Sequence, residues 1–156
     1  MAKQFMYDND AAIELKKGLD QLAKVVSVTM GPTGRHVIMQ KSYGSPSVTK
    51  DGVSVSKEVE LKSPFENMGA KMVNEVAKKT ADKAGDGTTT ATVLAREIFT
   101  QGLRHVTAGA NPVALQRGIL SAADAAGDAI TELASKCKGK DDLRKVATVS
   151  ANSNTE

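Results

Sequence analysis

A run of glycines, one carboxylate and three hydroxyls is the part of this sequence best suited to chemistry. Gly85-Asp86-Gly87 is followed by Thr88, Thr89 and Thr90, and an apolar helical pattern begins directly after them. The start of a helix carries unpaired N–H groups and a partial positive charge, so it attracts anions, and glycines let the backbone approach them closely. Asp86 would repel a phosphate, but it could hold a Mg²⁺ that the phosphates also bind. The segment therefore predicts a phosphate and metal site in which the threonine hydroxyls are donors.

The same segment can be read without any ligand. Gly-Asp-Gly before a helix can simply end one helix and cap the next. Three consecutive threonines are more than a cap requires, and threonine is a poor helix former. From this segment alone, a phosphate site and a plain helix boundary both stay open.

Two further loops carry residue types that fit the same chemistry. The loop at 29–35, Thr-Met-Gly-Pro-Thr-Gly-Arg, follows a predicted helix, and Lys50-Asp51-Gly52 follows a predicted strand. Together the three loops supply flexible backbone, hydroxyls, a cation and two carboxylates, which is what phosphoryl transfer to water needs. The sequence contains no Walker A motif, no Rossmann glycine fingerprint and no Cys/His spacing of a zinc site, so these three classes are unsupported.

Composition limits the class of protein. The chain has 156 residues, of which 40% are hydrophobic, 25% charged and only 3% aromatic, so we expect closely packed helices with an aliphatic core. The net charge of +3 comes from mixed acids and bases, which disfavours nucleic-acid binding. A single cysteine, Cys137, excludes an internal disulfide and favours a reducing compartment. No segment is long and apolar enough to be a secretion signal or a membrane span.

The elements that must position the loops are mainly helical. A first helix is predicted from about Asp8 to Thr29, capped by Asp8 or Asp10. Short strands predicted at 36–40 and 47–49 form a hairpin, whereas 53–61 is ambiguous between strand and helix. The apolar stripe of the first helix contains Leu15, Leu19, Leu22 and Val26.

A second helix is predicted from the sequence around residue 63. Ser63, Pro64 and Glu66 fit the N-cap, N1 and N3 positions of a capping box, and Gly85 ends the helix. A third helix reaches about Val106, a fourth opens at 111–112, and Asp141 caps a last segment. The stripes expected to enter the core are Phe65, Met68, Met72 and Val76; then Val93, Leu94 and Ile98; then Ile119, Ala123, Ala126, Ile130 and Leu133.

Five motifs in this order make the chain recognisable. They are the loop at 29–35, Thr-Lys-Asp-Gly-Val-Ser-Val at 49–55, Phe-Glu-Asn-Met-Gly-Ala-Lys at 65–71, the glycine–threonine block at 84–95 and Val-Ser-Ala-Asn-Ser at 149–153. The series resembles the group I chaperonins, the GroEL family, over essentially all 156 positions. Two departures are modest: Met30 stands where bacterial members often have Leu, and Thr33 stands where Lys is common.

The resemblance implies a mainly α fold with a small β-hairpin, namely the N-terminal half of a chaperonin equatorial domain plus the start of the intermediate domain. Residues 1–134 correspond to the first part and residues 135–156 to the second. The apical domain and the C-terminal part of the equatorial domain would lie outside this chain, which we therefore expect to be a fragment of a longer protein.

The resemblance also implies an ATP site with Mg²⁺ and a possible K⁺. Asp86 would ligate Mg²⁺, Asp51 would help orient the attacking water as the catalytic residue, and the backbone near Lys50 would help bind the monovalent cation. Other nucleotide contacts would come from two loops, through Thr29, Met30, Gly31, Pro32, Gly87, Thr88, Thr89 and Thr90. The family's main water-activating aspartate is absent from this chain, so we expect weak ATP binding and negligible hydrolysis by the chain alone.

The family role would be ATP-dependent encapsulation and folding of unfolded polypeptides by a homo-oligomeric double ring with a co-chaperonin lid. We expect a bacterial cytoplasmic protein rather than an organellar one, no membrane or nucleic-acid partner, and self-association of the isolated chain through uncovered helix stripes. The alternative is a non-catalytic helical interaction module whose Gly-Asp-Gly loop is only a helix cap. A basic nucleic-acid binder is a third class, which the mixed charges disfavour.

Overall fold

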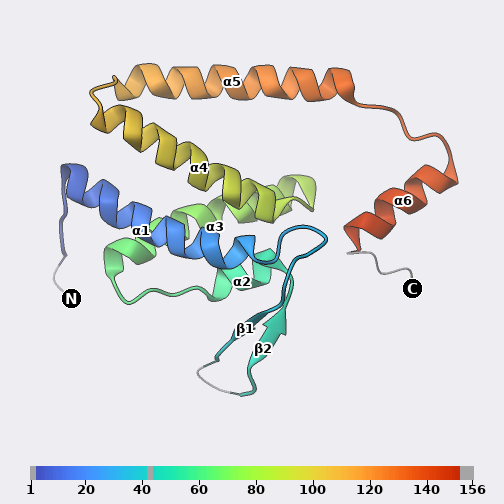
Figure 1. The fold of residues 1–156 in the computed structure, drawn as a ribbon, viewed down its shortest axis with the longest axis horizontal. Coiled ribbons are helices and arrows are strands. Elements are labelled where there is room, and N and C mark those ends of the chain that lie inside the picture. Colours follow the sequence, from blue (N-terminus) through green and yellow to red (C-terminus); the bar gives the residue numbers. More distant parts are fainter. Residues whose placement is uncertain (1–2, 42–43, 152–156) are drawn as a thin grey trace. The chain divides into compact units, whose positions relative to one another are not determined.

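The computed structural model describes residues 3–41 and 44–151 and has the expected fold class, helices with one small hairpin (Figure 1). It divides into two compact units, Met1–Gly109 and Ala110–Glu156. The domain boundary expected near residue 134 stays a prediction, and the end of the expected second domain, 152–156, lies outside the described residues. The elements are α1 (Asp8–Ser27), β1 (Val37–Met39), β2 (Ser47–Thr49), α2 (Gly52–Glu58), α3 (Pro64–Ala84), α4 (Thr88–Thr107), α5 (Pro112–Leu133) and α6 (Lys140–Ser150).

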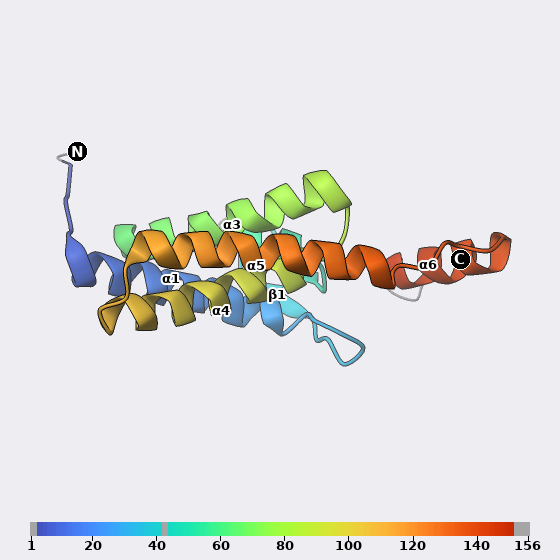
Figure 2. The same cartoon turned by 90° about the horizontal axis from the view of Figure 1, so that it is seen from above.

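The core of the first unit lies where α1, α2 and α3 meet, and α4 packs beside α1 and α3 (Figures 1 and 2). The predicted stripe of α1 enters this core, except that Leu15 is only half-buried. The ambiguous segment 53–61 is helical as far as Glu58, in the short helix α2, and residues 59–61 belong to neither a helix nor a strand. Helix α2 contributes Val55, which has no exposed surface. The buried cluster consists of Leu19, Leu22, Val26, Val55, Ala70 and Val73.

Helices α1 and α3 cross in direct backbone contact, because each has a glycine at the crossing. A Cβ added to Gly18 would lie 1.7 Å from the carbonyl oxygen of Glu66, and one added to Gly69 would lie 2.0 Å from that of Leu15. No side chain can occupy either position without moving a backbone. The crossing therefore fixes the separation of two helices whose C-terminal ends both lead into candidate loops.

The expectation that the methionine stripe of α3 enters the core is wrong for this chain. Met68 and Met72 are 55% and 59% exposed, because α3 meets α1 through its small residues instead. On α4, Leu94 and Ile98 are likewise about half exposed. The residues that α3 buries are Gly69, Ala70, Val73 and Ala77.

The caps agree with the sequence at some helix ends and differ at others. Ser63 Oγ accepts from the Glu66 N–H at 3.5 Å, but the Glu66 carboxylate accepts from Gln21 and does not close the capping box. Asn111 Oδ1 caps α5, since it accepts from two N–H groups of the first turn. The cap expected from Asp8 or Asp10 is wrong, because α1 begins after Tyr7 without a side-chain cap.

The start of α6 also differs from the expectation. Its N-cap is Gly139, so Asp141 lies inside the first turn and does not cap the helix. The neighbouring carboxylate of Asp142 accepts instead from the backbone N–H of Lys138 at 2.8 Å. Lys138 precedes the N-cap, so this contact fixes the chain before the helix and leaves the N–H groups of the first turn without a side-chain acceptor.

The hairpin is antiparallel, with Ile38 opposite Val48. Val37 and Met39 pack against the buried cluster, whereas Ile38 and Val48 are 75% and 57% exposed. The alternation anchors one face of the hairpin on the helices. Strand β2 thereby delivers Lys50 and Asp51 to the start of α2.

The second unit contains α5 and α6, neither of which has a buried residue. The α5 stripe expected to be core is exposed in this chain, with Ile130 at 68% and Leu133 at 83%. Among the described residues, none of the helices combines the length and apolarity that crossing a membrane requires.

Candidate functional site

The three loops singled out by their chemistry meet at Gly52, the first residue of α2. A Cβ built on Gly52 would lie 2.3 Å from Thr89 Oγ1 and 3.3 Å from Thr29 Oγ1. Thr29 follows α1 and Thr89 belongs to the first turn of α4, so segments far apart in the sequence come together here. The structure thus places side by side the three loops that the sequence analysis identified separately.

Glycines 85 and 87 have backbone conformations that suit glycine. Gly85 has φ 75° and ends α3, with its N–H bonded to the Ala81 carbonyl at 2.9 Å, and Gly87 has φ 80° and precedes α4. Other residue types are strained at positive φ. A Cβ at either position would meet no atom within 4 Å, so the backbone of this loop borders open space.

The first turn of α4 offers unpaired donors. The Gly87 carbonyl accepts the first intrahelical bond, from Ala91 at 2.9 Å, and no side chain caps the helix. The N–H groups of Thr88, Thr89 and Thr90 therefore lack intrahelical acceptors. Thr88 is buried, and its carbonyl accepts from the Thr92 hydroxyl at 2.9 Å, which holds the turn in place. With the partial positive charge of a helix start, this turn can bind an anion.

Asp86 lies beside these donors with one oxygen free. Its Oδ1 accepts from the Gly87 N–H at 2.6 Å, and Oδ2 has no hydrogen-bond partner among residues 3–41 and 44–151. Within the same ranges there is no group of three or more His, Cys, Asp or Glu that could enclose a metal. Mg²⁺ is commonly held by one or two carboxylates together with substrate phosphates. The donor set at Asp86 fits that kind of site and no all-protein metal cage.

Asp51 caps α2 with both carboxylate oxygens. Oδ1 accepts from the Val53 N–H at 3.2 Å, and Oδ2 accepts from the Ser54 N–H at 3.0 Å and the Ser54 hydroxyl at 2.5 Å. Desolvation raises the pKa of Asp51, but the hydrogen bonds from Ser54 and Val53 and the charge of Lys57 outweigh it, so the pKa is lowered. The carboxylate is ionised and fixed in direction. Lys50 beside it is exposed.

The loop after α1 is closed tightly by its own backbone. Thr29 Oγ1 donates to the Val26 carbonyl at 2.8 Å, and the Arg35 N–H donates to the Val28 carbonyl at 2.8 Å. Gly31 has φ 77° and no atom within 4 Å of an added Cβ. The residues at the tip, Met30, Gly31 and Pro32, are all exposed, so they are accessible to a ligand.

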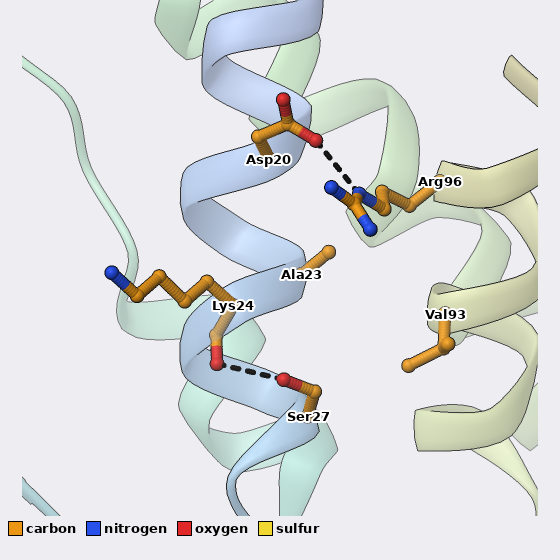
Figure 3. A pocket seen from close by; sticks show the side chains of 6 residues that line it. All are labelled: Asp20, Ala23, Lys24, Ser27, Val93 and Arg96. Carbon is orange, nitrogen blue, oxygen red and sulfur yellow. Dashed lines mark hydrogen bonds and ion pairs between the residues drawn. The ribbon is translucent and has the colours of Figure 1, made fainter. Parts of the chain in front are cut away.

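A separate pocket of about 320 Å³ lies between α1 and α4 (Figure 3). Arg96 Nε of α4 donates to Asp20 Oδ1 of α1 at 2.7 Å across it, and Lys16 also pairs with Asp20. Burial raises the pKa of Asp20, but hydrogen bonds from Lys16 and Arg96 outweigh it and lower the pKa. The pocket contains none of the predicted nucleotide residues. The Asp20–Arg96 ion pair links α1, which Thr29 follows, to α4, which begins at Thr88.

Sequence reasoning missed the role of three glycines. Gly52 belongs to a loop predicted to follow a strand, with no indication of its contact with Thr89, and the sequence analysis does not single out Gly18 or Gly69. Glycine inside a helix costs about 1 kcal/mol relative to alanine, so an interior glycine beside apolar residues is itself a signal of close packing. No comparable signal links Asp20 with Arg96.

Two comparisons with known proteins bear on the family and the fold of this chain. A family model described as the TCP-1/cpn60 chaperonin family matches residues 22–156. The chain is also similar to the crystal structure of a group III chaperonin in the open state, with 26% identity and a TM-score of 0.79. That alignment covers 93% of this chain and 29% of the other, so this chain spans less than a third of that protein's length.

Proposed function

This chain belongs to the TCP-1/cpn60 chaperonin family, and we propose that it forms part of the ATP- and Mg²⁺-binding site of an ATP-dependent chaperone. The observation that carries the proposal is the meeting of three loops at Gly52. Each loop brings a different kind of group: tightly turned backbone after α1, an ionised carboxylate before α2, and unpaired N–H donors at α4.

In this proposal the first turn of α4 binds phosphate. The N–H groups of Thr88, Thr89 and Thr90 and the exposed hydroxyl of Thr90 donate to phosphate oxygens. Gly87 takes part through its backbone, because its missing side chain leaves that side of the loop open. The loop of Thr29, Met30, Gly31 and Pro32 would contact the rest of the nucleotide.

Asp86 is the proposed Mg²⁺ ligand, through the oxygen that makes no hydrogen bond. Mg²⁺ bound there would neutralise phosphate charge, which is what makes an aspartate compatible with an anion site. Asp51 would help orient the attacking water, and the backbone near Lys50, with K⁺, would support the same region. Hydrolysis by this chain alone would be negligible, because loss of a water-activating group commonly costs about 10²–10⁴ in rate.

The role of the whole protein is part of the same proposal. A chaperonin that encapsulates unfolded polypeptides in a homo-oligomeric double ring, with a co-chaperonin lid, in the bacterial cytoplasm, is what the resemblance to group I members supports. Within this proposal the ordered motifs support group I, and the structural likeness is to a group III chaperonin.

The alternative function, an interaction module with a plain helix cap at 85–87, receives less support. A cap would satisfy the first N–H groups of α4 with a side chain, whereas Gly87 has none and no other side chain replaces it.

Equilibrium binding of ATP tests the proposal. We expect the 156-residue chain to bind ATP weakly in the presence of Mg²⁺ and more weakly without it. Asp86→Asn should remove the effect of Mg²⁺, and the matched control Asp82→Asn, an exposed carboxylate in the last turn of α3, should retain it. Equal Mg²⁺ dependence in both variants, or no ATP binding by the unaltered chain at millimolar concentration, would contradict the proposal.

A further inference from the structure

The backbone conformation at position 52 does not require glycine. The glycines with positive φ are 31, 44, 85, 87, 109 and 139 among the described residues, and Gly52 is not one of them. Any residue could adopt its conformation. Gly52 is nevertheless buried, and the space where a side chain would begin is filled by atoms of α1, of the loop that follows it and of α4. The position is restricted by its surroundings alone.

We propose that Gly52 is a positioning residue for the nucleotide site, because its missing side chain leaves a notch that holds the Thr89 hydroxyl. The inference rests on the proposed function, in which Thr89 binds phosphate. Gly52 directly follows Asp51, so the contact between Gly52 and Thr89 also sets the distance between the α2 cap and the first turn of α4. The absence of a side chain at Gly52 would thereby allow the Asp51 carboxylate to lie close to the phosphate-binding N–H groups of α4.

The notch cannot accept a methyl group cheaply. A Cβ at Gly52 would be 2.3 Å from Thr89 Oγ1, 3.2 Å from Val26 Cγ1 and 3.3 Å from Thr29 Oγ1. Val26 is 1% exposed, and the Thr29 hydroxyl is already bonded to the Val26 carbonyl, so neither can retreat freely. Thr89 must then rotate its hydroxyl to another rotamer, which is restricted for a β-branched residue in a helix, or α2 must move away from α4.

A double-mutant cycle with Gly52→Ala and Thr89→Ala tests the inference through the affinity for MgATP. Gly52→Ala should weaken binding by about tenfold, as expected when displacement of Thr89 moves its backbone N–H out of hydrogen-bond distance of a charged phosphate. In the Thr89→Ala background, the same change should cost at most about twofold, because the atom it displaces is gone. A merely structural role of Gly52 would give the same loss in both backgrounds, and that result would overturn the inference.

Two controls separate the possible failures. Gly127→Ala, in α5 where an added Cβ meets nothing within 4 Å, should leave MgATP affinity unchanged. Thermal unfolding without nucleotide should show that Thr89→Ala relieves the destabilisation caused by Gly52→Ala, which tests the notch itself. Absence of MgATP binding by the unaltered chain would contradict the proposed function. Normal binding by Gly52→Ala, in a chain that does bind, would contradict only the positioning inference.

Discussion

Gly18 of α1 lies so close to Glu66 of α3 that the missing side chain of one faces the backbone carbonyl of the other. Gly69 of α3 and Leu15 of α1 repeat the relationship one turn away. The two glycines let the helices touch at their backbones, and both helices then run toward the loops of the candidate site (Figure 2). The crossing therefore helps to fix the positions of those loops relative to each other.

Gly18→Ala should destabilise the chain although alanine is the better helix former. The added methyl would overlap the Glu66 carbonyl, and overpacking of this kind costs about 1–3 kcal/mol. The free energy of unfolding in urea, followed by circular dichroism, measures the effect. Gly127→Ala is the matched control, because its added methyl meets nothing and should be neutral or stabilising by up to about 1 kcal/mol. Equal stability of the two variants would show that the helices do not cross this closely.

Asp51 should contribute to stability as a cap, separately from any part in hydrolysis. Asp51→Ala removes the acceptors for Val53 and Ser54 and should cost about 1 kcal/mol, whereas Asp51→Asn keeps an acceptor and should cost less. Thermal unfolding of both variants checks the difference. If alanine and asparagine were equally tolerated, Asp51 would not be capping α2 in solution.

Asp20 should make stability depend on pH. Its pKa is lowered in the folded chain, so the ionised form stabilises the fold above the unfolded value of about 3.9, and this contribution disappears as pH falls through the lower folded value. Asp20 and Arg96 are both partly exposed, so screening limits the effect to about 0.2–1 kcal/mol at neutral pH. Asp20→Asn should lower the melting temperature at pH 7 and at low salt, and the difference should shrink in acid. A difference that persists in strong acid would point to packing and not to charge.

The sequence predicts the parts of the fold that depend on local chemistry. Pro64, Gly85 and Asn111 mark helix ends correctly, because caps and positive φ are set by neighbouring residues. The candidate loops are found for the same reason, since a glycine–threonine run before a helix has its properties wherever the helix lies. Asp8 fails as a cap because α1 begins one residue after Tyr7, which no local rule distinguishes from the alternatives.

What the sequence does not predict depends on which faces meet. Met68 and Met72 have the spacing of a buried stripe, but α1 packs against the adjacent face of α3, which carries small residues. In the same way, Gly52 has the sequence context of an ordinary turn glycine. Only the packing of α1, α2 and α4 places Thr29 and Thr89 beside it. A single sequence can indicate that a position is closely packed, but it does not show which distant segment packs against it.

The uncovered apolar surface of α5 should make the chain self-associate. Leu120, Ile130 and Leu133 are each more than half exposed, and contiguous apolar surface drives association. Light scattering should show a mass that rises with concentration, and Ile130→Ser with Leu133→Ser should reduce it. Asp124→Ser, an exposed polar change in the same helix, is the control. A clean monomer at high concentration would contradict the expectation.

The most direct test of the nucleotide site is an amide-resolved titration of the ¹⁵N-labelled chain with MgATP, because it reports which backbone N–H groups meet the ligand. The largest shifts should fall on Gly87, Thr88, Thr89 and Thr90, and Mg²⁺ with adenosine, which lacks phosphates, should leave these amides unmoved. A response confined to other segments, such as the pocket around Asp20 and Arg96, or the same response to adenosine as to MgATP, would contradict the account.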